Sequence, residues 1–96
     1  MSLELEPMMA VLNALARDTP RSVGERVRAA DEQIKAWIAQ TKDLSERQRM
    51  LRDLDGKVAL QEVDEFSTML RAHVAQLLAA IRNLDLSERD GRTPRR

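Results

Sequence analysis

The chain has 96 residues, and its 16 basic side chains balance its 16 acidic ones, so no net charge draws it toward nucleic acid or an anionic membrane. The absence of cysteine from the sequence excludes disulfides and thiolate chemistry, including cysteine-based metal sites. Leu, Ala, Glu and Arg dominate and aromatic residues make up only 2%, a bias that predicts a single all-α domain with a modest core.

The first predicted helix covers about residues 3–17, where Leu5, Met8, Leu12 and Leu15 recur at helical spacing. The N-terminal stretch carries Glu4 and Glu6 where a secretory signal would carry basic residues, and no apolar run reaches the length of a membrane span. We therefore expect a soluble, cytoplasmic protein without membrane contact.

A second helix is predicted over about residues 22–54. Ser22 and Glu25 have the spacing of a capping box, which starts a helix because each side chain binds a free backbone N–H. A heptad seam then continues at steps of four and three, and it consists of Val23, Val27, Ala30, Ile34, Trp37, Thr41, Leu44, Gln48 and Leu51. Ser45 and Gln48 form a second capping-box spacing at which the helix could restart, but the seam passes it without a change of phase. We therefore predict one continuous helix.

Gly56 is predicted to end this helix in a left-handed conformation, and a third helix is predicted over about residues 58–85. Its seam consists of Leu60, Val63, Ser67, Leu70, Val74, Leu77, Ile81 and Leu84. Folding the chain back at Gly56 makes the two seams antiparallel, with the pairs Val27 and Leu84, Ile34 and Leu77, and Leu51 and Leu60. The predicted fold is a three-helix, coiled-coil-like domain of residues 1–86, with residues 87–96 as a flexible basic tail.

The stretch 51–62 resembles the calcium-binding loop of EF-hand proteins. Gly56 stands at the sixth position of that loop, and carboxylates stand at the third, fifth and twelfth, namely Asp53, Asp55 and Glu62. The first position is Leu51 and the ninth is Ala59, so two ligand positions of the family pattern lack a side-chain oxygen. A helix end followed by a turn explains the same residues. We predict the turn, and keep a calcium-responsive module as an alternative.

No phosphate loop, nucleophile elbow or zinc-protease pattern occurs, and His73 is the only histidine. We therefore predict that the protein is not an enzyme and holds no cofactor or metal. Three tail arginines, Arg92, Arg95 and Arg96, could contact phosphates. Without a stacking aromatic or a groove-reading helix nearby, nucleic-acid binding is kept only as an alternative function.

The flank of the hairpin near its turn is the predicted site of function, and it consists of Met50, Leu54, Phe66, Met69 and His73. The first helix is too short to cover this flank, and an open apolar patch is costly for a monomer. We predict that it binds a second copy, giving a homodimer, or a helical protein partner. The function predicted is non-enzymatic: a helical interaction or assembly module, such as a chaperone-like protein, an adaptor or a structural subunit.

Overall fold

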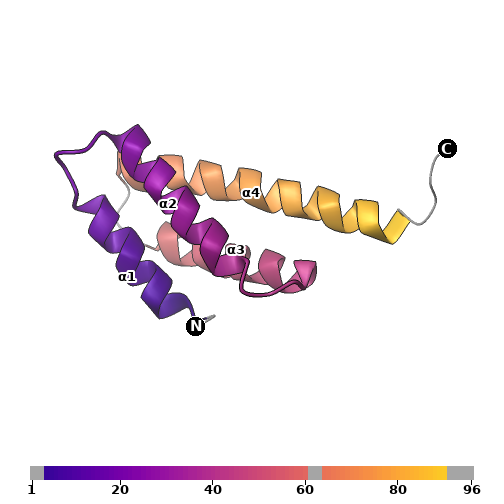
Figure 1. Ribbon diagram of the computed structural model, residues 1–96. Coiled ribbons are helices and arrows are strands. Elements are labelled where there is room, and N and C mark those ends of the chain that lie inside the picture. The colour runs from indigo at the N-terminus through magenta and orange to yellow at the C-terminus, as the bar shows by residue number, and fades with distance from the viewer. Residues whose placement is uncertain (1–3, 61–63, 91–96) are drawn as a thin grey trace.

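The computed structural model describes residues 4–60 and 64–90, with side chains described up to Glu88. In these residues the chain forms four helices and no strand: α1 (Leu5–Ala16), α2 (Val23–Ile38), α3 (Leu44–Ala59) and α4 (Glu65–Asp90) (Figure 1). The prediction of an all-α protein is confirmed. The prediction of three helices is wrong, because the expected long second helix is interrupted.

The start of α2 is the predicted capping box. The Glu25 backbone N–H donates to Ser22 Oγ at 3.2 Å, and the Ser22 backbone N–H donates to Glu25 Oε1 at 3.1 Å. The second of these bonds is the main reason why the pKa of Glu25 lies below its ordinary value. The local sequence therefore determines where α2 begins.

The break between α2 and α3 spans residues 39–43. Asp43 is the cap of α3, and its Oδ1 accepts from the backbone N–H groups of Ser45 at 2.9 Å and Glu46 at 3.4 Å. Thr41 Oγ1 accepts in turn from the backbone N–H of Asp43 at 3.1 Å. These side chains satisfy backbone donors that a continuous helix would have used, so a helix end replaces the predicted continuation.

Gly56 does not end a helix. It lies inside α3, and no glycine in the described residues has a positive φ. The helix ends instead at Ala59, with Leu60 as its C-cap, and Asp64 starts α4 by accepting from the backbone N–H of Ser67 at 2.7 Å. The turn therefore lies several residues beyond the predicted one, and residues 61–63 fall outside the described part.

The four helices form two helical hairpins packed side by side. Arg26 caps the end of α1 while Met8 lies against Trp37, so α1 and α2 are antiparallel. Gln48 bonds Asp85, and Asp55 bonds Arg71, so α3 and α4 are also antiparallel (Figure 1). The main neighbours of α1 are α2 and α3, and those of α4 are also α2 and α3.

The direction of α4 relative to α2 reverses the prediction. Arg26 lies over the ring of Phe66 and Asp31 bonds His73, so residue numbers rise together along both helices. The two helices are parallel. The predicted antiparallel pairs of residues 27 to 37 with residues 74 to 84 are therefore wrong, and so is the expected register of a single long hairpin.

The core lies where all four helices meet. Its buried apolar side chains are Met8, Leu12, Ala30, Ile34, Trp37, Ile38, Met50, Leu51, Leu54, Val58, Phe66, Leu70, Val74 and Ile81. The helix α4 has 26 residues, against 16 in α2, and its C-terminal part extends beyond α1 and α2 (Figure 1). Residues 87–90, which were assigned to the flexible tail, belong to this helix, and residues 91–96 lie outside the described part.

Candidate interaction surface

The predicted turn-proximal site does not form one exposed patch. Met50, Leu54 and Phe66 are 2%, 0% and 4% exposed, while Met69 is 40% exposed. His73 is partly buried between α4 and α2, where it contacts Asp31. The premise that these side chains lack cover is therefore wrong for the three buried ones.

The cover comes from α1, which packs differently from the prediction. Met9 and Leu12 line the same small cavity as Val58 and Phe66, so α1 lies along α3 and reaches the start of α4. An antiparallel α1 on a single long hairpin would have stopped short of this region. The break at residues 39–43 divides the predicted second helix into two shorter ones. A first helix of 12 residues is therefore long enough to cover the core.

Arg26 is a buried cation that fixes the α1–α2 connection. Its Nη1 donates to the Ala16 carbonyl at 3.0 Å and its Nε donates to the Arg21 carbonyl at 3.2 Å. The guanidinium also lies 5.5 Å from the centre of the Phe66 ring. The side chain thus satisfies carbonyls at the end of α1 and ties both helices to α4. This role could not be predicted from the sequence, since nothing local distinguishes Arg26 from the other arginines.

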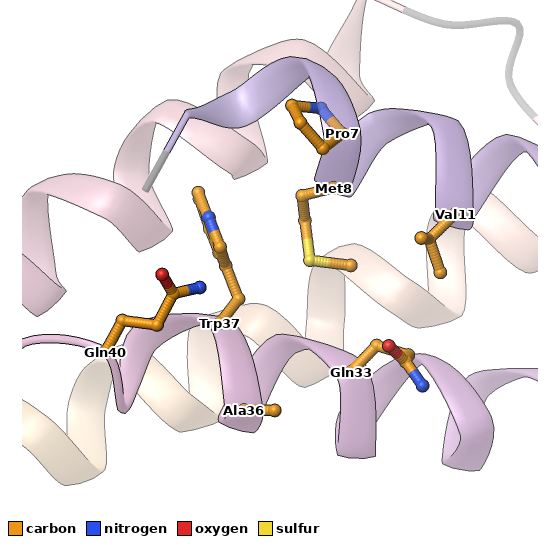
Figure 2. A pocket seen from close by; sticks show the side chains of 7 residues that line it. All are labelled: Pro7, Met8, Val11, Gln33, Ala36, Trp37 and Gln40. Atoms are coloured by element: carbon orange, nitrogen blue, oxygen red, sulfur yellow. The ribbon is translucent and has the colours of Figure 1, made fainter. Parts of the chain in front are cut away.

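A shallow groove of about 290 Å³ runs between α1 and α2 (Figure 2). Pro7, Met8 and Val11 line it from α1, and Gln33, Ala36, Trp37 and Gln40 line it from α2. Trp37 is 6% exposed, and its Nε1 is buried without a hydrogen-bond partner. Because that N–H is itself shielded from the groove surface, a ligand in the groove would contact mainly apolar atoms.

The Asp31–His73 pair is the contact that most resembles a catalytic arrangement. His73 Nε2 lies 2.5 Å from Asp31 Oδ1, and Lys35 Nζ lies 3.2 Å from Asp31 Oδ2. The carboxylate therefore bridges a histidine and a lysine. Within the described residues, no three His, Cys, Asp or Glu side chains are placed to hold a metal ion. The geometry is that of a clamp between α2 and α4.

The loop required by the calcium alternative is also not formed. Residues 51 to 59 are helical, so Asp53 and Asp55 project from α3 instead of converging, and Asp53 accepts from Arg49 at 2.7 Å. Asp55 accepts from Arg71 Nε at 3.0 Å, and this hydrogen bond raises the pKa of Arg71 above its ordinary value. Glu62, the predicted twelfth ligand, lies outside the described residues. The helix over residues 51–59 therefore contradicts the loop geometry that the EF-hand-like interpretation requires there.

The face of α4 that points away from the core is exposed to solvent. Ala72, Ala75, Ala79, Arg82 and Leu86 are all exposed and follow one another at alternating steps of three and four, so they lie on one side of the helix. Leu86 is 57% exposed, and the charged Arg82 interrupts the apolar residues. We call these five residues the outer stripe. It lies on the opposite side of α4 from the buried Leu70 and Val74.

A second groove adjoins the outer stripe. Its volume is about 490 Å³, and it is lined by Arg52, Asp55, Arg71, Ala72, Val74, Ala75 and Leu78. Its lining combines four apolar side chains with two arginines and one aspartate. Arg52 forms no hydrogen bond or ion pair with the described residues.

The projecting end of α4 adds further apolar surface. Leu84 continues the seam of Leu77 and Ile81, yet it is 53% exposed where Ile81 is 7% exposed. The reason is that α2 ends before this level, and α3 alone accompanies α4 there, as the bond between Gln48 and Asp85 shows (Figure 1). The periodicity of Leu77, Ile81 and Leu84 was visible in the sequence, but the exposure of Leu84 depends on where α2 ends.

No family model, curated protein or solved structure matches the chain. None of the helices in the described part is long and apolar enough to cross a membrane.

Proposed function

We propose that the protein is a non-enzymatic helical interaction or assembly module that acts by self-association or by binding a helical partner. The observation that carries this proposal is the exposed apolar surface of α4: Leu84 and Leu86 are 53% and 57% exposed near its C-terminal end, and a groove of about 490 Å³ lies between α3 and the N-terminal half of α4. Exposed apolar side chains and concave grooves are both typical of protein–protein contacts. The proposed contact therefore moves from the turn-proximal flank to the outside of α4, and Met69 is the one residue of the original set that is still exposed.

The polar contacts support a structural role for the side chains that might otherwise suggest catalysis. His73 and Asp31 hold α4 on α2, and Arg26 holds α1 in place. Each of these groups is engaged in joining helices, and none lies in the groove beside the outer stripe. The proposed activity is thus recognition of another helix by a preformed surface.

Site-specific photo-crosslinking tests this proposal. A photoreactive amino acid replaces Leu86 in one variant and Leu60, which is 82% exposed at the end of α3, in a matched control. We expect a discrete covalent product from position 86, either with a second copy or with one other protein, and none from position 60. Equal, diffuse labelling from both positions, or no product from either, would contradict an interaction role for α4.

Calcium titration tests the alternative. Since residues 51 to 59 are helical, millimolar calcium should leave both the helicity and the heat signal unchanged. A saturable heat with defined stoichiometry would restore the calcium-responsive function.

A further inference from the structure

We propose that two copies of the chain exchange their α1–α2 hairpins, with residues 39–43 as the hinge. In the exchanged dimer residues 23–59 form one continuous helix, and α1 and α2 of each copy pack on α3 and α4 of the other. The inference rests on the self-association in the proposed function and deepens it by naming the partner and the segment that moves. It uses the packing between the two hairpins, which the structure shows within one chain, and does not use the outer stripe.

The first argument is the sequence of the hinge. Residues 39–43 read Ala-Gln-Thr-Lys-Asp and contain neither glycine nor proline, so no residue there forbids a helix. The heptad seam also passes from Trp37 through Thr41 to Leu44 at steps of four and three, without a change of phase. Two helices that a loop always separates do not require a common phase. The sequence therefore fits a straight helix as well as it fits the break.

The second argument is the backbone, which needs little change to become helical. Asp43 has a φ of −78°, which is already a helical value, and it departs from a helix in its ψ of 112°. The backbone N–H of Ala39 bonds the Lys35 carbonyl at 3.0 Å, so the bonding pattern of α2 extends into the hinge. Within the described residues no non-glycine residue has a positive φ. The hinge therefore holds no left-handed residue that would have to invert.

The third argument is that local side chains hold the bend. Asp43 Oδ1 accepts from the backbone N–H groups of Ser45 and Glu46. Thr41 Oγ1 accepts from the Asp43 N–H, and Arg47 Nε donates to the Thr41 carbonyl at 2.7 Å. In a continuous helix the same N–H groups would donate to the carbonyls four residues earlier. Straightening therefore exchanges side-chain bonds for backbone bonds and leaves few backbone groups without a partner.

The fourth argument is that a second copy restores the packing that straightening removes. The two hairpins share one core, in which Ile34 of α2 is buried with Leu51 of α3 and Leu70 of α4. A straight helix over residues 23–59 carries α2 away from α3 and α4 of the same chain, which would expose this core. Thr41 is the midpoint of that helix, and α2 and α3 run in opposite directions (Figure 1). Two such helices that cross antiparallel at Thr41 therefore place each α2 beside the α3 of the other copy.

Two substitutions at Asp43 test the hinge in opposite directions. Asp43→Ala removes the cap of the bend and favours the continuous helix, so it should tighten dimerisation about tenfold or more, since both hinges of the dimer change. Asp43→Gly removes the same side chain, but glycine is tolerated as a cap and disfavours a helix interior, so it should weaken dimerisation. Light scattering coupled to size exclusion, over a range of concentrations, measures the mass. We expect the wild type to approach twice the chain mass of 10.9 kDa as concentration rises.

Cross-linking between two differently tagged chains tests the exchange itself. One chain carries Glu4→Cys beside α1 and the other carries Asp53→Cys on α3, two exposed positions that line one cavity of about 320 Å³. The chain has no cysteine of its own. After the two chains are unfolded and refolded together, a short bismaleimide should join them, because the cavity then forms between copies.

The matched control pair is Asp55→Cys in one chain and Arg71→Cys in the other. These two side chains bond each other within the α3–α4 hairpin, which stays in one chain during the exchange. The bismaleimide should therefore leave the two tagged control chains separate.

The outcomes separate the inference from the proposed function. A wild type that stays at 10.9 kDa at every concentration overturns the inference, and the function stands if position 86 still cross-links to another protein. A dimer in which Glu4→Cys and Asp53→Cys do not join the two chains also overturns the inference, as does an equal change of dimerisation in Asp43→Ala and Asp43→Gly. Exchange without any product from position 86 supports the inference and removes the outer side of α4 from the function.

Discussion

The imidazole of His73 and the carboxylate of Asp31 join α4 to α2, with 2.5 Å between Nε2 and Oδ1. Burial is the largest single influence on the pKa of Asp31 and acts to raise it. The hydrogen bonds and charges of His73 and Lys35 together exceed it, so the pKa lies below its ordinary value. The carboxylate therefore favours the folded state, and its contribution depends on pH.

The first prediction concerns Asp31→Asn. A lowered pKa in the folded state means that the contribution is complete above the unfolded pKa of about 4 and is lost as pH falls through the lower folded value. The variant should therefore lose about 1–3 kcal/mol of stability near pH 7. Urea unfolding at about pH 7 and about pH 2 measures this difference, which should shrink at the lower pH. A loss of equal size at both pH values would show that the charge of Asp31 is not responsible.

The second prediction concerns Arg26, whose guanidinium donates to carbonyls at the end of α1 and lies over Phe66. Arg26→Met keeps a long apolar side chain but leaves those carbonyls without this donor. We expect a loss of about 1–3 kcal/mol in the free energy of unfolding. The control is Arg28→Met, because Arg28 is exposed and forms no hydrogen bond or ion pair with the described residues. Its effect should stay within about 0.5 kcal/mol, and equal effects for both variants would contradict the assigned role.

Part of the core could be predicted from the sequence, because burial follows local periodicity, although the seam residues Leu60 and Leu84 are 82% and 53% exposed. Ile34, Leu51 and Leu70 were all placed on heptad seams, and they are 0%, 0% and 1% exposed. The pairing of the seams could not be predicted in the same way. It depends on where the chain turns, and the positions of Asp43 and Asp64 at helix starts decide that. Moving the turn by several residues changes every partner while leaving each seam intact.

The premise that the predicted site lacks cover was wrong for a related reason. Met50, Leu54 and Phe66 were recognised as apolar residues outside the seam, and they needed cover, as predicted. Their cover depends on the direction of α1 relative to α3, which no local pattern encodes. Leu84 had the opposite outcome: it was placed on the buried seam, but α2 ends before this level, so Leu84 is 53% exposed on a helix that continues to Asp90.

The third prediction concerns Gly56, which lies inside α3 with no positive φ. A Cβ added there would meet nothing within 4 Å. Gly56→Ala should therefore stabilise the protein by about 0.5–1 kcal/mol, because alanine loses less conformational entropy in a helix. Thermal unfolding followed by circular dichroism measures the shift. A destabilisation of about 1 kcal/mol or more would indicate the left-handed helix end that the sequence suggested.

The fourth prediction concerns the break between α2 and α3, where Asp43 caps α3 through its bonds to the backbone of Ser45 and Glu46. Asp43→Ala removes both bonds and should cost about 0.5–2 kcal/mol, whereas Asp43→Asn keeps an acceptor and should cost less. In an uninterrupted helix the sign would reverse, because alanine is a better helix former than aspartate. Ser45→Ala is the matched control: its hydroxyl would be the cap if the helix restarted two residues later, and it should change stability by less than about 0.5 kcal/mol. Chemical unfolding of the three variants thus measures where α3 begins, and a larger loss for Ser45→Ala than for Asp43→Ala would move that start to Ser45.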